Sequence, residues 1–164
     1  MGQRHEWVDE QRQRVDDLID EYRVALLDSL NGLTEEEARR RLVPSKTTLL
    51  GLDKHATFVE GVWFDQAITG RSSADTGISS TVDGSFKLRA TDTIASVQAE
   101  FRERWATSRR IIDGRPLDEV VDGRGGRARP VWALKLQVLR ELAQHAGHVD
   151  ILREQIIAGR SPGS

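Results

Sequence analysis

Apolar residues recur at three- and four-residue steps in four long stretches of this 164-residue chain. Such spacing places them along one side of a helix, so each stretch is predicted to be an amphipathic α-helix. Strand-like alternation is nearly absent, and the expected fold class is therefore all-α, a four-helix bundle with one short extra helix. The expected helices are residues 6–30, a short one at 35–41, 48–68, a third long one from a cap at Thr91 or Asp92 to Asp113, and 131–158.

Capping residues mark several of the boundaries. Thr34, with Glu37 three positions later, has the capping-box pattern and opens the short helix. Ser45 or Thr47 is expected to cap the second long helix, and Pro130 opens the last one.

Two segments between the helices, 71–90 and 117–130, are rich in polar and glycine residues and are predicted to be long loops. Loops of this length inside a compact domain are functional or mobile. The length of the chain is that of one ordinary domain, so residues 1–164 are expected to form a single unit.

Composition excludes several classes of function. Lys and Arg total 24 against 26 Asp and Glu, so no basic footprint for nucleic acid is expected. No apolar run approaches the roughly 20 residues that cross a bilayer, and the charged first residues have no apolar segment behind them, so we expect no membrane partner and a cytoplasmic location. The absence of cysteine excludes disulfides, thiolate metal sites and a protein thiol nucleophile.

Three of the four histidines lie on apolar helical stripes, where a solvated residue is not expected. His55 is flanked by apolar residues one turn away on both sides, and so is His145. His148, three residues later, shares that face because a three-residue step leaves two side chains about 60° apart. The fourth histidine, His5, is expected to face solvent.

A buried imidazole needs partners for its nitrogens, and for one histidine alone an ordinary hydrogen bond is the simpler interpretation. Three together favour a shared metal ion, and His55, His145 and His148 are therefore the predicted ligands. Three protein ligands leave one position open for water or substrate, as in catalytic sites. Zinc is the first candidate and nickel the second, since imidazole suits both.

Carboxylate and amide groups lie one turn before two of these histidines. Glu141 precedes His145 by four residues, and Gln144 precedes His148 by four. Either can accept a ring N–H and orient an imidazole. A solvated Glu141 is an equal alternative, and Glu141 is also the candidate catalytic base if a metal-bound water is the nucleophile.

Two stretches resemble the DinB superfamily. They are residues 45–60 with Trp63-Phe64 after them, and residues 141–155 with their core His-Ala-Gly-His-Val-Asp-Ile-Leu-Arg-Glu. The resemblance is closer to the actinobacterial subgroup that includes the mini-circle proteins. It implies a bundle with an up-down-down-up arrangement and a divalent metal held by one histidine of the second helix and two residues of the fourth. His55 and His148 fall on positions where the superfamily has histidines. In the superfamily the middle ligand usually lies four residues before the last ligand, a position that Gln144 occupies here. The subgroup uses a spacing of three residues, which implies His145 as the middle ligand, with Gln144 as the alternative.

Relatives in this superfamily include mycothiol-dependent maleylpyruvate isomerase and bacillithiol S-transferases, in which the metal activates a low-molecular-weight thiol. The resemblance therefore implies a metal-dependent thiol S-transferase that joins a thiol such as mycothiol to an electrophilic small molecule. Arg124, Arg127 and Arg129 are candidates to hold an anionic thiol, although a solvated loop is the simpler interpretation. The alternatives are a non-catalytic metal- or ligand-binding stress protein and a metal-dependent hydrolase. A homodimer formed through a helix face is also an expectation.

Overall fold

The computed structural model describes residues 2–160, without the side chains of residues 2–8 and of Arg124. Consequently the expectation for His5 falls on a side chain outside the described residues. The elements, in chain order, are α1 (Gly2–Ser29), α2 (Glu35–Ala38), α3 (Leu49–Glu60), the π-helix η1 (Gly61–Gln66), α4 (Ala67–Thr69), α5 (Ser73–Thr76), α6 (Val82–Ser85), α7 (Ile94–Ile112), β1 (Val120–Val121), the short 3₁₀-helix η2 (Arg124–Gly126), β2 (Arg129–Pro130) and α8 (Val131–Ala158). α3, η1 and α4 follow one another without a break and form one long helical segment.

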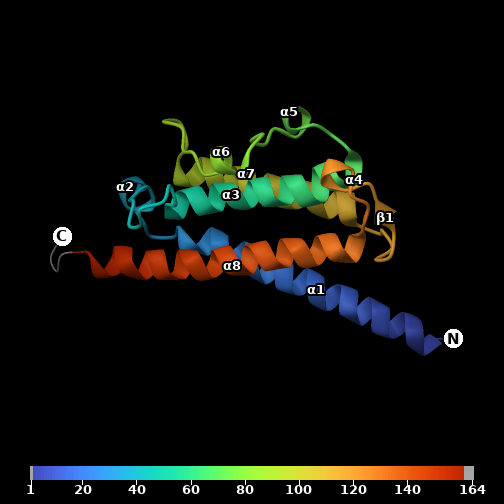
Figure 1. Ribbon diagram of the computed structural model, residues 1–164. Helices are drawn as coiled ribbons and strands as arrows, with labels where there is room; N and C mark the ends of the chain where they lie inside the picture. Colours follow the sequence, from blue (N-terminus) through green and yellow to red (C-terminus); the bar gives the residue numbers. More distant parts are fainter. Residues whose placement is uncertain (1, 161–164) are drawn as a thin grey trace.

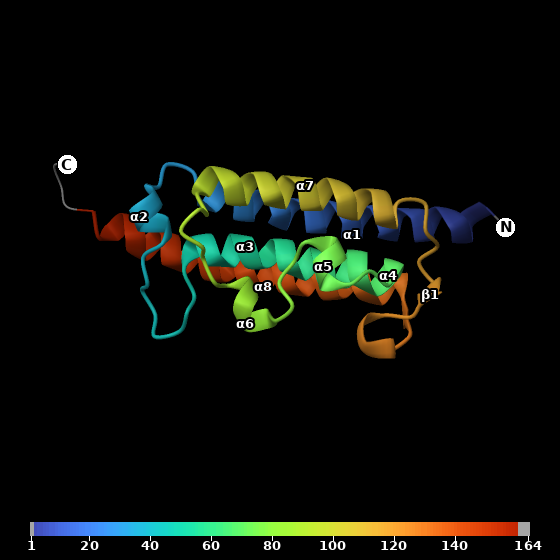
Figure 2. The ribbon, with the colours of Figure 1, turned by 90° about the horizontal axis from the view of Figure 1, so that it is seen from above.

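Four long helical segments lie side by side in a bundle, which confirms the predicted all-α fold (Figures 1 and 2). α1 packs mainly against α8, and α3 packs against both α7 and α8. The colours show that α1 and α8 run in one direction and that α3 and α7 run in the other, which is the up-down-down-up arrangement. Among the described helices none is long and apolar enough to cross a membrane.

The segment between α4 and α7 is a crossover that the bundle arrangement requires. Because α3 and α7 run in the same direction, residues 70–93 must return along the length of the bundle, and they do so over α3 (Figure 2). The sequence predicted an unbroken loop over most of this segment, whereas the structure forms two short helices, α5 and α6, capped by Ser72 and Thr81. Gly61 lets the crossover lie close, since a Cβ there would come within 2.7 Å of Ile78.

The start of the second long helix differs from the prediction by one residue or more. The capping box of Thr34 and Glu37 is confirmed at α2. The N-cap of α3, however, is Thr48, whose hydroxyl accepts from the Gly51 N–H at 3.0 Å, rather than Ser45 or Thr47. The hydroxyls of Ser45 and Thr47 bond to each other instead, at 3.0 Å.

The predicted N-cap of α7, Thr91 or Asp92, was also wrong, whereas the predicted end at Asp113 agrees with the structure. Thr93 is the N-cap and forms a capping box with Ser96. Asp92 is buried, and its carboxylate accepts from Lys54 Nζ at 2.6 Å and from the Arg89 side chain at 2.9 Å. The bond from Lys54 ties the crossover to α3, and Asp92 does not cap α7.

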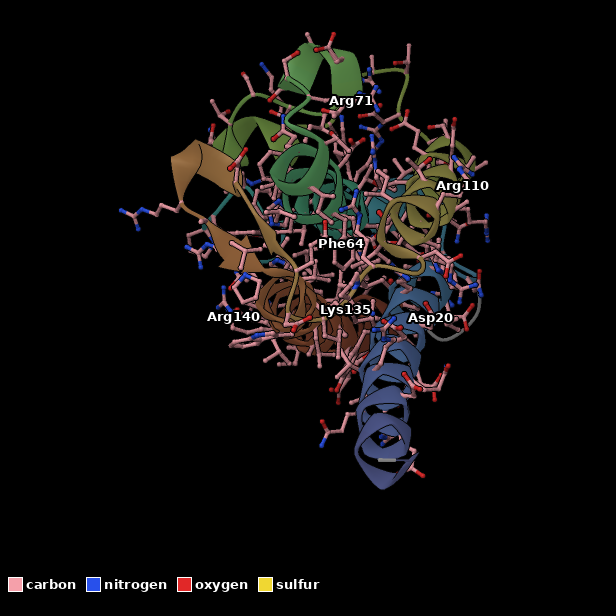
Figure 3. All side chains as sticks on the ribbon, turned by 90° about the vertical axis from the view of Figure 1, so that its right-hand side faces the viewer. Asp20, Phe64, Arg71, Arg110, Lys135 and Arg140 are labelled. Carbon is pink, nitrogen blue, oxygen red and sulfur yellow. The ribbon has the colours of Figure 1, made fainter. Side chains whose placement is uncertain are left out.

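A buried ion pair joins α1 to the end of α3. Arg23 donates to both carboxylate oxygens of Glu60, from Nε at 2.6 Å and from Nη2 at 3.0 Å, and its guanidinium also lies over the Trp105 ring of α7. Figure 3 looks at the end of the bundle where α8 begins, and there Phe64 points into the space between the helices while Lys135 lies toward α1. The Lys135 ammonium donates to Asp16 of α1 at 2.6 Å.

Candidate metal centre

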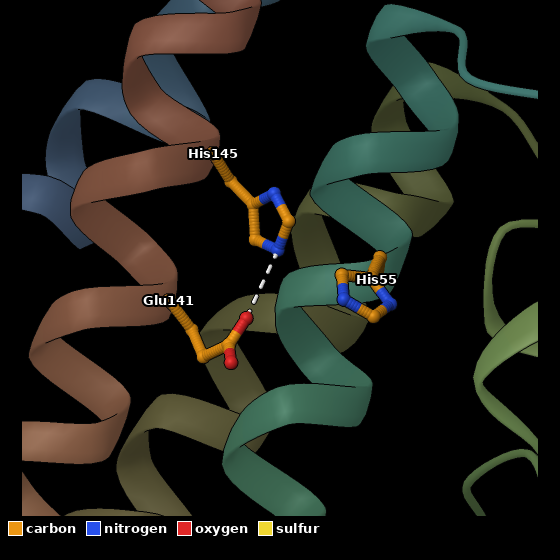
Figure 4. Close-up of side chains that lie close together, drawn as sticks. All are labelled: His55, Glu141 and His145. Carbon is orange, nitrogen blue, oxygen red and sulfur yellow. Dashed lines mark ion pairs between the residues drawn. The ribbon is translucent and has the colours of Figure 1, made fainter.

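Facing side chains of α3 and α8 form a cluster of three potential ligands. Figure 4 shows His55 on α3 opposite Glu141 and His145 on α8. One ligand atom from each of the three lies within 4.8 Å of the others. The two α8 residues meet because a four-residue step is close to one helical turn. Both histidines are buried, with 4% and 8% of their surfaces exposed.

The crossover fixes the orientation of the His55 ring. The Phe86 ring stacks on it, with centroids 3.9 Å apart and planes 13° from parallel. His55 Nδ1 lies 2.6 Å from the hydroxyl oxygen of Ser85, and that hydroxyl is 2.5 Å from the carbonyl oxygen of Val82. A hydroxyl has one hydrogen, and a carbonyl can only accept, so Ser85 donates to Val82 and accepts from His55 Nδ1–H. The proton is therefore on Nδ1, and Nε2 keeps its lone pair for the cluster.

His145 has neither ring nitrogen hydrogen-bonded within the described part of the chain. The nearest acceptor, Glu141 Oε2, is 3.5 Å from His145 Nε2, which is longer than an ordinary hydrogen bond. The other oxygen of Glu141 accepts from Gln137 Nε2 at 2.9 Å and from the Arg140 guanidinium. These two donors hold the carboxylate in place and leave Oε2 turned toward His145.

Burial keeps both histidines of the cluster neutral. It lowers the pKa of His55 to about 3, with a smaller contribution from the neighbouring His145. Burial also lowers the pKa of His145, although the Glu141 carboxylate opposes that effect. Neutral imidazole is the form that binds a metal ion, so this part of the site is already in the required state near pH 7.

The donor set fits a divalent metal ion. A buried imidazole without hydrogen-bond partners is costly, and a shared cation would satisfy His55, His145 and Glu141 together. A comparison with known families agrees with this geometry: the model of the mycothiol S-transferase family matches residues 14–158. The chain belongs to the mycothiol S-transferase family. This membership confirms the DinB-like relationship that the sequence indicated, and no curated protein matches the chain.

His148 lies at the rim of the cluster in this family member. It is exposed, and its ring centroid is 5.9 Å from that of His145. Gln144, the alternative ligand, is also exposed. The structure therefore brings together two of the three predicted ligands and adds Glu141, the residue four before His145. The four-residue spacing that the resemblance to the DinB superfamily implied would fit Glu141 and His145 if His145 were taken as the last ligand.

Arg127 and Arg129 of the second loop are not near the cluster. Arg127 and Arg129 precede α8, and His145 lies 14 residues after its start, about 21 Å along the axis at 1.5 Å per residue. The Arg129 guanidinium lies over the Trp63 ring. The side chain of Arg124 is outside the described residues.

Sequence reasoning missed Ser85 and Phe86, which touch His55 from the crossover. They are 30 and 31 residues further along the chain, in a segment without strong periodicity. No local pattern connects them to a histidine on α3.

Proposed function

We propose that this protein is a divalent-metal-dependent thiol S-transferase, which joins a low-molecular-weight thiol such as mycothiol to an electrophilic small molecule. The observation that carries the proposal is the cluster of buried His55 and His145 with half-buried Glu141, in a chain of the mycothiol S-transferase family. Zinc is the first choice of metal and nickel the second, because two imidazoles and a carboxylate suit both.

The protein's own residues prepare the site for a thiolate. His55 and His145 offer neutral nitrogens, Ser85 keeps the proton of His55 on Nδ1, and Gln137 and Arg140 hold Glu141. When bound, a divalent ion would lower the pKa of a thiol and favour its thiolate form. The donor set carries one negative charge, so a dication and a thiolate together would leave the buried site neutral, which limits the cost of burying charge.

The transfer itself needs only the thiol and the electrophile. The thiol proton leaves for solvent, a sulfur lone pair forms the bond to the electrophilic carbon, and the leaving group departs with the electron pair of the broken bond. The protein has no cysteine, so the reacting sulfur must come from the cosubstrate. For the same reason, thiol consumption can be followed without a background from the protein.

The first experiment measures zinc and nickel binding by protein purified without an affinity metal column, for wild type, His145→Ala, Glu141→Gln and His148→Ala. We expect one ion per chain in wild type and in His148→Ala, and loss of the ion in the other two variants. If His148→Ala loses the ion and Glu141→Gln keeps it, the ligands are the three histidines and Glu141 has another role. Wild type that binds no metal at neutral pH would contradict the proposal.

The second experiment tests the reaction with the metal-loaded protein. We expect mycothiol to be consumed together with an aromatic electrophile such as 1-chloro-2,4-dinitrobenzene, and consumption to stop after chelation and return when zinc is added. Metal binding without thiol consumption for any electrophile tried would favour the non-catalytic metal-binding protein. Zinc-dependent ester hydrolysis without thiol, abolished in Glu141→Gln, would favour the hydrolase.

A further inference from the structure

A second feature of interest is a cavity of about 290 Å³ between α8 and the linker that joins α2 to α3. The linker contributes one wall and the C-terminal half of α8 the other. The described lining residues are Val43, Ser45, Thr47, His148, Ile151, Leu152 and Gln155. The volume is close to the lower end of the range of small-molecule sites, roughly 300 to 1,000 Å³.

The cavity begins beside the candidate metal centre. Its first α8 residue is His148, whose ring centroid lies 5.9 Å from that of His145. From there it extends seven residues along α8 to Gln155, about 10 Å at 1.5 Å per residue. Leu152 lies seven residues after His145 and therefore on nearly the same face of α8. A molecule in the cavity would thus have one end against His148, at the rim of the cluster.

The lining favours an uncharged, largely apolar ligand. Among the described lining residues there is no carboxylate, ammonium or guanidinium. Cavities elsewhere differ: the one near Lys135 and the one near Arg104 are each lined by several charged side chains. Ile151 has 58% of its surface exposed and so offers apolar area to a ligand. Covering such area is favourable.

The walls of the cavity are held in place before any ligand binds. Arg41 Nη2 donates to the carbonyl oxygens of Pro44 and Ser45, at 2.9 Å each, and fixes the path of the linker. The Ser45 hydroxyl donates to the Thr47 hydroxyl at 3.0 Å. A preformed site binds more tightly because less freedom is lost on binding.

We infer that this cavity binds the body of the electrophilic cosubstrate, an uncharged and largely apolar small molecule, and points its reactive carbon toward the cluster. The inference rests on the proposed function, in which the thiolate sulfur bonds to that carbon and the leaving group departs with the electron pair. An exposed apolar face could instead be covered by a second copy of this chain. The experiment below distinguishes a bound electrophile from such a dimer.

The test uses metal-free protein and 1,3-dinitrobenzene, an aromatic probe without a leaving group, so that neither metal nor thiol is needed. Chemical shifts of the backbone amides are followed by NMR during titration. We expect the largest changes at Thr47, His148, Ile151 and Gln155. Replacing Ile151 by Asp should weaken binding about tenfold, because apolar contact is lost and a charge is placed in the cavity. The matched control is Ile157→Asp, which changes an isoleucine of α8 that is 42% exposed and outside the cavity, and it should leave binding within twofold.

Shifts that concentrate at another cavity, or equal effects of the two aspartate variants, would overturn the inference. A wild-type mass in solution that falls from dimer to monomer in Ile151→Asp, with no probe binding, would assign the face to a second copy. If wild type proves unable to bind metal but the probe still binds at the cavity, the proposed function is refuted and the cavity assignment stands. If thiol transfer is metal-dependent but Ile151→Asp has an unchanged KM for the electrophile, the proposed function stands and the cavity assignment is refuted.

Discussion

Replacing Ser85 by Ala is expected to weaken metal binding. Ser85 is not itself a candidate ligand, and the effect is expected to act through His55, which the Ser85 side chain contacts. In the wild-type structure the Ser85 hydroxyl accepts from His55 Nδ1–H at 2.6 Å, and only 4% of the histidine surface is exposed. Without the hydroxyl, either Nδ1–H is buried without an acceptor or the proton moves to Nε2, which removes the lone pair from the cluster.

The size of the effect follows from the burial of the ring. A buried donor that loses its partner costs about 1 to 3 kcal/mol, and loss of a residue that orients a metal-bound histidine typically weakens affinity about 10- to 100-fold. We therefore expect zinc to bind Ser85→Ala about 10 to 100 times more weakly than wild type. The control is Ser79→Ala in the same crossover, whose hydroxyl donates to the Thr81 carbonyl and not to a histidine; it should bind zinc like wild type.

Two measurements check this expectation. Zinc affinity is determined by competition with a chelating dye, and nitrogen-15 NMR of the histidine rings reports which nitrogen of His55 carries the proton. Wild type should show the proton on Nδ1, and in Ser85→Ala the population with a proton on Nε2 should rise. A wild-type ring protonated on Nε2, or a Ser85→Ala affinity within twofold of wild type, would refute the reasoning.

Three further predictions concern stability, measured by urea unfolding of the metal-free protein. Burial lowers the pKa of His55 to about 3 in the folded state, below the roughly 6.5 of an unfolded histidine. Between those pH values the unfolded state binds more protons, so the free energy of unfolding should fall by up to about 2 kcal/mol from pH 6.5 to pH 5. The fall should be smaller in His55→Gln. Burial raises the pKa of the Asp53 carboxyl, which has no hydrogen-bond partner among the described residues. The folded state therefore favours the protonated carboxyl, so there is no stability cost below about pH 4, and the free energy of unfolding falls as the pH rises and the carboxyl must ionise or stay protonated at a cost. Asp53→Asn should be more stable than wild type at pH 8 and close to it at pH 4. Arg23→Met should lower the free energy of unfolding by about 3 to 5 kcal/mol, because Glu60 is left as an unpaired buried charge. The double variant Arg23→Met with Glu60→Leu should regain much of this stability. An equal loss in the single and the double variant would show that packing, not charge, is responsible.

The helices and the general place of the site could be predicted from the sequence because their signals are local. The bounds of α8, Val131–Ala158, follow from a long apolar period between Pro130 and Gly159. His55 and His145 stood out because each lies on an apolar stripe, where burial is expected. The N-caps of α3 and α7 were misplaced by one to three residues, since several neighbouring hydroxyl and carboxyl groups could serve and tertiary partners decide among them.

The composition of the cluster could not be settled in this way. Glu141 and His148 both lie within one turn of His145, and the rotation of α8 against α3 decides which of them meets His55. That rotation is set by packing of the whole α8 face, including residues far from the site.

The contacts made by Ser85 and Phe86 depend even more on tertiary structure. Helical periodicity alone determines that this chain forms four long helices with buried histidines on two of them. Only the assembled bundle, in which α3 and α7 run in the same direction, makes residues 70–93 return over α3 and places a hydroxyl and an aromatic ring against His55. The physical reason is that periodicity is a property of neighbours in sequence, whereas a crossover contact depends on helix direction and on the space left between packed helices.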